Sequence, residues 1–341
     1  MEDYTIAVAE YQKGNFSKAI KFWKKVANNN AIEEKVRGKA FLGLGFAYSK
    51  SENLKEAVSS LKAALSLFKN DKKSQAETLG VLGGLYFRNG LVKESLSTFQ
   101  IALSLAQQIK NREMEAEMLG EIGSILDFLD KYDDAIDFFT RALKLYRKIA
   151  KNKESRGEAR ALYDLGTALY HAKKLEEARS ILEKASRMMK KSNDKKGEAN
   201  LHATLGDIYL EFGQYDIAEK NYKRAQDYYQ AIKNMIGIIN VELGFGKIYF
   251  ANEDLSHAKE KFEAALELAT KNNYSRLSAS ALLYLSKISE RLGETKESEN
   301  YTKKAQKILK DLGIKPEELE VKTENAVNKT EDFVNTTEDQ K

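Results

Sequence analysis

Small residues recur along the chain at intervals of 38 to 43 residues, each at the same point in a repeated pattern of polar and apolar positions. A second small residue follows twelve positions later, and a third follows seven after that. Large apolar residues keep offsets of 3, 4 and 7 from these positions, which places them on one face of a helix. The pattern predicts an all-α chain with two helices per repeat and eight helical hairpins over residues 1–312. The first small residues are Ala7, Gly45, Gly83, Gly123, Gly166, Gly206, Gly246 and Ser286.

Short polar segments separate the predicted helices. Lys13-Gly14-Asn15 lies within a hairpin, and asparagines such as Asn111 and Asn234 lie between repeats. Because Asn and Gly tolerate the left-handed conformation that ends a helix, we expect these residues to adopt it. A glycine inside a helix costs about 1 kcal/mol relative to alanine, so the repeated glycines predict close contacts between helices.

The composition agrees with a folded helical chain. Apolar residues make up 42% and charged residues 31% of the chain, and Pro316 is its single proline. The absence of cysteine excludes disulfides, thiolate metal sites and cysteine nucleophiles. No apolar run is long enough to span a bilayer and no apolar segment follows Met1, so we expect a cytoplasmic protein without a membrane span.

The net charge of +5 is unevenly distributed. Residues 314–341 contain four Lys and eight Asp or Glu, which leaves +9 for the rest of the chain. Acidic and basic residues are interleaved in that body, which disfavours nucleic-acid binding. Gly313 and Pro316 predict the end of the last helix, and residues 313–341 are expected to be an acidic, disordered tail. A weak apolar spacing at Leu319, Ala326 and Phe333 leaves open a short amphipathic helix in that tail.

The repeated residues resemble a known repeat family. Leu44-Gly45 followed by Tyr48, then Ala57, Leu61 and Ala64, fits a pattern of L-G-x-x-Y, A-x-x-x-F and a further Ala, which is similar to the tetratricopeptide repeat (TPR). The resemblance covers residues 1 to about 312, with a longer period than the usual 34 residues. It implies a right-handed superhelical solenoid that binds peptides or helices on its concave wall. Long repeats of this kind resemble Pins-type adaptors, kinesin light chains and Rap-type regulators.

Motifs for catalysis, metals and cofactors are missing from the sequence. The three histidines are 31 and 55 residues apart, which is not a metal-ligand spacing. Gly244-Phe245-Gly246-Lys247 lacks the Gly and Ser/Thr of a phosphate loop, because Val241 and Ile248 stand at those positions. We therefore expect no catalytic, metal or cofactor-binding residues and no cofactor, with an enzyme kept as a minor alternative.

The concave wall is the predicted binding site. With the first small residue of each repeat at position 8, the wall consists of positions 2, 6, 9 and 13, flanked by 5 and 12. Glycines at such positions, beside apolar residues, predict room for an apolar anchor, and acidic residues further along predict attraction of basic groups. Two plainer interpretations stay open: the glycines tighten helix packing, and the charges solvate an exposed face. The predicted groove residues are Gly43, Phe46, Gly80, Val81, Gly84, Phe87, Glu121, Asp127, Asp164, Asp207 and Glu211.

The leading hypothesis for function is a non-catalytic interaction scaffold or adaptor. Its partner would be a protein or peptide segment with an apolar anchor and basic residues. A peptide-responsive regulator of the Rap type is the alternative. Positions that clamp a peptide's C-terminal carboxylate in some members of the family hold Tyr4, Val8, Gly43, Glu77 and Val81 here, so that clamp is not expected.

Overall fold

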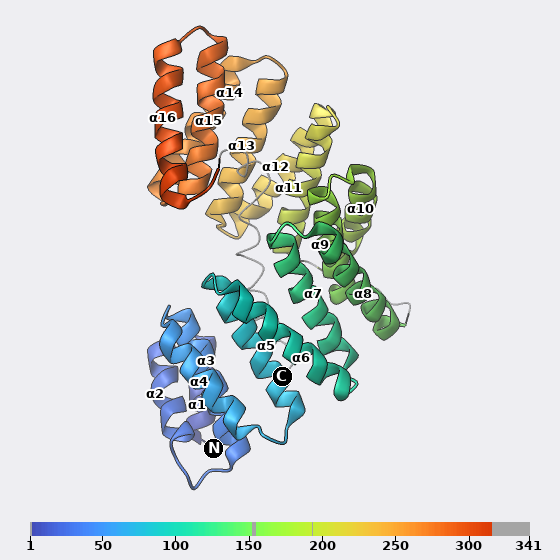
Figure 1. Cartoon of the computed structure of the whole chain (residues 1–341), viewed down its shortest axis with the longest axis vertical. Helices are drawn as coiled ribbons and strands as arrows, with labels where there is room; N and C mark the ends of the chain where they lie inside the picture. The colour runs from blue at the N-terminus through green and yellow to red at the C-terminus, as the bar shows by residue number, and fades with distance from the viewer. Residues whose placement is uncertain (1, 152–154, 193, 316–341) are drawn as a thin grey trace. The chain divides into compact units, whose positions relative to one another are not determined.

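The computed structural model describes residues 2–151, 155–192 and 194–315, and these residues form sixteen helices with no strand. They divide into two compact units on either side of residues 152–154, which we call unit 1 and unit 2. Each unit contains four antiparallel helical hairpins (Figure 1). The prediction of an all-α repeat fold made of eight hairpins is confirmed. The predicted tail lies, from residue 316 on, outside the described residues.

The helices of each unit follow one another with short connections. Unit 1 contains α1 (Glu2–Gln12), α2 (Phe16–Ala27), α3 (Glu34–Lys50), α4 (Leu54–Leu67), α5 (Lys72–Arg88), α6 (Val92–Gln108), α7 (Arg112–Phe128) and α8 (Tyr132–Ala150). Unit 2 contains α9 (Arg156–His171), α10 (Leu175–Ser192), α11 (Lys195–Glu211), α12 (Tyr215–Ala231), α13 (Met235–Ala251), α14 (Leu255–Lys271), α15 (Ser275–Arg291) and α16 (Thr295–Leu312). Gly313 ends α16 in the left-handed conformation with a φ of 66°, as predicted.

The repeated glycines allow the two helices of a hairpin to approach closely. A Cβ built on Gly123 would lie 2.8 Å from the Phe139 ring, and one on Gly206 would lie 2.6 Å from the Tyr222 ring. Gly45, Gly83, Gly166 and Gly246 likewise face the large residue of the second helix in their own hairpins. The predicted close contacts between helices at the repeated glycines are therefore confirmed, because these positions leave room only for a hydrogen atom.

The asparagines between repeats have a different role from the predicted one. Asn111 and Asn234 have φ angles of −85° and −83°, and their side chains accept hydrogen bonds from Met114 N and Gly237 N. The left-handed residues are Lys110 and Lys233, each one position earlier. The prediction of the left-handed conformation for these two asparagines is wrong, because an asparagine side chain satisfies the free N–H groups at a helix start.

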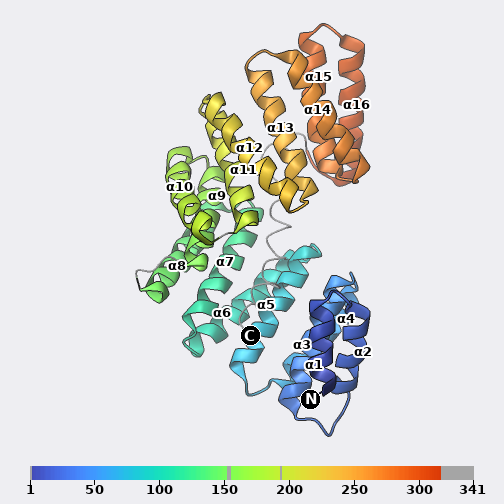
Figure 2. The ribbon, with the colours of Figure 1, turned by 180° about the vertical axis from the view of Figure 1, so that it is seen from behind.

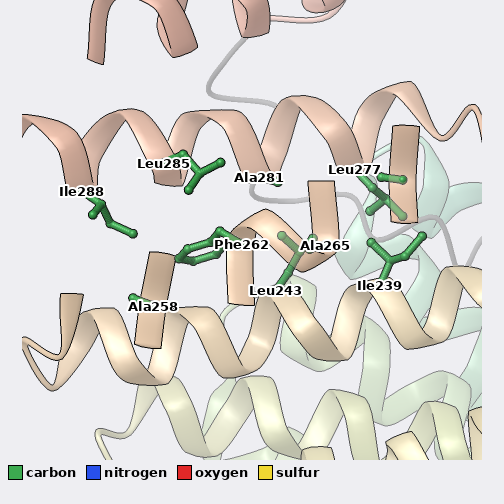
Figure 3. Close-up of a cluster of buried hydrophobic side chains, with 10 residues drawn as sticks. Ile239, Leu243, Ala258, Phe262, Ala265, Leu277, Ala281, Leu285 and Ile288 are labelled. Atoms are coloured by element: carbon green, nitrogen blue, oxygen red, sulfur yellow. The ribbon is translucent and has the colours of Figure 1, made fainter. Parts of the chain in front are cut away.

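The core of each unit lies between successive hairpins. In unit 2, Phe262 of α14 lies between Leu243 of α13 and Leu285 of α15, and Ile239 of α13 belongs to the same cluster, opposite Leu277 (Figure 3). α15 in turn packs against both α14 and α16, which Figure 2 shows from behind. Each hairpin therefore shares its buried surface with the next one, as in other solenoid repeats.

Candidate peptide-binding face

The odd-numbered helices of each unit form one continuous row. α1, α3, α5 and α7 contact one another in sequence in unit 1, and α9, α11, α13 and α15 do so in unit 2. Over the described residues, consecutive even-numbered helices make no contacts of comparable extent. The more closely packed row lies on the inside of the curve within a unit, so the odd-numbered helices carry the concave face.

An open space lies beside Gly84 on this face of unit 1. Gly84 is shielded from solvent, yet a Cβ built there would meet no atom within 4 Å. A Cβ built on Gly120 of α7 would likewise meet no atom within 4 Å. Val81 and Phe87 of α5 are buried, and the Phe87 ring contacts the Phe128 ring of α7 edge-on at 5.3 Å. We call Val81, Gly84, Phe87, Gly120 and Phe128 the apolar surface of unit 1.

Gly43 does not belong to such an open space. A Cβ at Gly43 would lie 2.4 Å from Cε2 of Trp23, a residue of the preceding hairpin. Gly244 makes room in the same way for Tyr222, at 2.6 Å. The expectation that packing leaves Gly43 unexplained is therefore wrong, because the Trp23 ring of the preceding hairpin occupies the space that a side chain at position 43 would need.

The other predicted residues of unit 1 lie on α3, α5 and α7. Phe46 is partly exposed on α3, and Gly80 is buried on α5. Glu121 and Asp127 of α7 are only 6% and 9% exposed. Both carboxylates therefore lie mostly below the surface, where a cation reaching them would interact more strongly than in bulk water.

In unit 2, the predicted acidic residues each contact a partner within the unit. Asp164, which is buried, lies 3.9 Å from the Arg160 guanidinium. The Tyr222 hydroxyl donates a hydrogen bond of 2.6 Å to Asp207. Glu211 is more exposed and pairs with Lys173 at 2.9 Å. Each of the three acidic residues therefore already has a polar or charged partner.

The environment of Asp207 favours its neutral form. Burial raises the pKa of Asp207, while the charge of Lys247 and the hydrogen bond from Tyr222 partly oppose the increase. Burial, together with the negative charge of Asp207, also raises the pKa of Tyr170 and of Tyr222 well above the ordinary value. Both tyrosine hydroxyls therefore stay protonated and can donate hydrogen bonds at neutral pH.

Aromatic rings on the face of unit 2 are covered by cations. The Lys247 and Lys287 ammonium groups lie 5.7 and 4.9 Å from the centre of the Tyr284 ring, which stacks on Phe262 at 4.6 Å. Arg291 lies 4.1 Å from the centre of the Phe250 ring. Sequence reasoning missed Tyr170 and Tyr284 as members of this face. Their positions, 12 and 6 of their repeats, are wall positions, so the register could have found them.

This arrangement offers surfaces for binding. In the part of the chain that the structure describes, no group of three or more His, Asp or Glu could hold a metal ion. No helix within the described ranges is long and apolar enough to cross a membrane. Apolar gaps, aromatic rings and paired charges on a row of helices can hold an extended peptide or a helix.

Comparison with protein families identifies the repeat. Sequence models described as tetratricopeptide repeat match residues 38–71, residues 74–148 and 157–231, and residues 121–188. Together these matches cover more than half of the chain. The chain belongs to the tetratricopeptide repeat family. The TPR identity agrees with the resemblance carried by the small-residue pattern, while comparison with curated protein sequences gives no match.

Solved structures share the TPR fold with this chain. A Rap protein complexed with competence and sporulation factor is 18% identical, with a TM-score of 0.62 over 86% of this chain and 80% of that one. The apo form of RapI is 16% identical, with a TM-score of 0.64 over 80% and 98%. BtubC (BKLC) from P. vanneervenii is 19% identical, with a TM-score of 0.55 over 66% and 92%. At these identities the likeness establishes the fold.

Proposed function

We propose that the chain is a non-catalytic, cytoplasmic interaction scaffold that binds a peptide or helix of a partner protein on the concave face. The observation that carries this proposal is the space beside Gly84. A helical glycine costs about 1 kcal/mol, and at Gly84 no neighbouring side chain uses the room that the missing Cβ leaves. An apolar side chain of a partner could fill that room, next to Val81 and Phe87.

Acidic residues define the other part of the proposed partner. Glu121 and Asp127 lie on α7, in the same unit as the apolar surface. On the face of unit 2, Glu211 would attract a basic group, because its ion pair with Lys173 is largely exposed. Asp164 and Asp207 would contribute less, because Asp164 is buried beside Arg160 and the environment of Asp207 favours its neutral form. The partner segment would then carry an apolar anchor and basic residues.

A peptide-responsive regulator is the second candidate. Its support is the fold shared with the Rap protein complexed with competence and sporulation factor. The Rap conjugation gene regulator of plasmid pLS20 in complex with the Phr* peptide adds to it, at 15% identity and a TM-score of 0.61 over 82% of this chain and 75% of that one. A ligand peptide that changes the X-ray scattering profile of the chain would favour this candidate over a passive scaffold.

Selection from a displayed peptide library against the purified chain tests the proposal. We expect selected peptides to pair an aromatic or aliphatic residue with nearby Lys or Arg. Gly84→Leu should fill the space and weaken binding by about tenfold or more, which corresponds to the loss of one buried apolar anchor.

Ser97→Leu is the matched control, because Ser97 is exposed on α6 of the same hairpin and receives the same side chain. Circular dichroism would establish that both variants are folded. Unchanged affinity of the selected peptides for folded Gly84→Leu would contradict the proposal.

A further inference from the structure

The second half of α8 carries positive charge without any acidic residue. Residues 138–151 contain five Lys or Arg and no Asp or Glu, although the first turn of the same helix is acidic. Arg141, Lys144 and Lys148 are exposed, and at about 100° per residue they lie within an arc of about 60° around the helix. They extend over about 10 Å of the helix axis. We call Arg141, Lys144 and Lys148 the basic row.

Contacts within unit 1 do not account for the basic row. Cations stabilise a helix through its dipole only in the last turn, and Arg141 and Lys144 lie more than one turn before α8 ends. Arg141 pairs with Asp137 at 3.5 Å. Among the residues that the structure describes, no acidic side chain forms an ion pair with Lys144 or Lys148. The two lysines are therefore available to an acidic partner.

Partly exposed apolar side chains lie beside the basic row. Phe138 and Leu145 are half-buried, and Ile149 is 38% exposed. These three residues lie about 40° to 80° around the helix from Arg141, between the basic row and the buried face that contains Ala142. The Arg141 guanidinium already covers the Phe138 ring, at 4.9 Å from its centre. A partner that follows the basic row can therefore also cover Leu145 and Ile149.

The spacing of the basic row favours a helical partner. Its steps of three and four residues correspond to about 4.5 and 6 Å along the axis, and a helix with Asp or Glu at the same steps would place its carboxylates at the same intervals. Same-side residues of an extended chain are about 7 Å apart, so they would lose this register. The same repeat positions on α6 are Ile101, Ser104 and Gln108, so the charge does not spread to the preceding hairpin. A single row is a poor match for a broad anionic membrane surface.

We propose that the basic row of α8 binds an acidic amphipathic helix of a partner protein, whose acidic residues pair with the row and whose apolar residues cover Leu145 and Ile149. This second docking surface lies on an even-numbered helix and shares no residue with the concave face. It therefore goes beyond the proposed function and does not depend on it.

Fluorescence anisotropy with the full-length chain tests this surface. The probe is a labelled helical peptide of about 20 residues, long enough to hold its helix, with Glu at steps of three and four beside a row of Leu. A second peptide has the same composition, with its acidic residues dispersed around the helix. The chain should bind the patterned peptide at least about tenfold more tightly than the dispersed one, and 0.5 M salt should remove most of this preference.

Two double variants locate the contact. Lys144→Glu with Lys148→Glu should weaken binding of the patterned peptide by about tenfold or more, because two attractions become repulsions. Lys55→Glu with Lys62→Glu is the matched control, because both lysines are exposed on α4 of the same unit and the net charge changes equally. It should change the affinity by less than about twofold, and circular dichroism would establish that both variants are folded.

Three results would overturn the proposal. The first is the absence of any preference for the patterned peptide, and the second is an equal loss of binding in the two double variants. The third is binding of the chain to vesicles that contain phosphatidylserine, lost in the Lys144 and Lys148 double variant, without binding of the peptide. That result would assign the basic row to a membrane surface.

Discussion

Position 9 of the repeat is Gly84 in α5, whereas it is Asp207, Lys247 and Lys287 in α11, α13 and α15. Position 12 is Phe87 in α5 and Phe250 in α13, but the surroundings of the two rings differ. In unit 1 the Phe87 ring contacts the Phe128 ring, whereas in unit 2 the Phe250 ring contacts both the Tyr284 ring and the Arg291 cation. Unit 1 therefore presents an apolar surface with unfilled space, and unit 2 presents a network of paired charges and rings.

The two units nevertheless share the same hairpin interior. Gly83 faces Phe99 in unit 1 just as Gly246 faces Phe262 in unit 2. The buried small positions fix how close the helices come, and this leaves the wall positions free to differ in chemistry. The difference between the faces thus follows from side chains that the fold does not require.

Adjacent glycines on α5 give the largest expected effect. Gly83→Ala places a Cβ 2.9 Å from the Phe99 ring, whereas Gly84→Ala places one in open space. We expect Gly83→Ala to lower the free energy of unfolding by about 1–3 kcal/mol through overpacking. Gly84→Ala should raise it by up to about 1 kcal/mol, because alanine is the better helix former.

Urea unfolding gives the free energy of unfolding of both variants. Each variant is the control for the other, because both replace glycine with alanine on the same helix. Equal effects of the two substitutions would mean that the space beside Gly84 is already filled, and the contrast between the units would then disappear.

The sequence predicts the repeat far better than the face. Small residues at positions 8, 20 and 27 lie where the two helices of a hairpin must approach closely, so their spacing predicts the sixteen helices. The wall residues obey no such rule. Gly43 and Gly84 look alike in the sequence, yet one accommodates Trp23 and the other borders open space. The partners of Asp207 come from different hairpins, through Tyr222 and Lys247, and a single helical pattern does not specify them.

Two acidic residues, one in each unit, should respond to pH in opposite directions. Asp71 of unit 1 accepts a hydrogen bond from Ser74 N and pairs with Lys35 at 2.9 Å, and these contacts lower its pKa to about 2. Its stabilising contribution is present above the unfolded value of 3.8 and is lost as pH falls toward about 2. Asp71→Asn keeps the helix cap but loses the charge. It should therefore lower the free energy of unfolding by about 1–2 kcal/mol at neutral pH and leave it unchanged near pH 2.

Asp207 of unit 2 has the opposite shift, because burial raises its pKa. Its favourable contribution is fully present below 3.8 and is lost as pH rises through the folded-state value. Relative to Asp207→Asn, the natural chain should therefore gain stability as pH falls toward 4. Chemical unfolding of both variants across this range, with the natural chain measured in parallel, gives the two slopes. Slopes of the same sign would show that burial does not raise the pKa of Asp207.

The smallest expected effect concerns Lys173, which pairs with Glu211 and lies 5.7 Å from the centre of the Tyr170 ring. Both charged groups are partly exposed, so Lys173→Gln should lower the free energy of unfolding by no more than about 1 kcal/mol. Salt at 0.5 M should remove most of that difference, because exposed ion pairs are screened. Lys220→Gln, an exposed substitution on α12, should have no measurable effect at either salt concentration. A loss well above 1 kcal/mol that persists in salt would show that packing on Tyr170, rather than charge, holds this part of the face together, and the paired charges of unit 2 would then matter less than its rings.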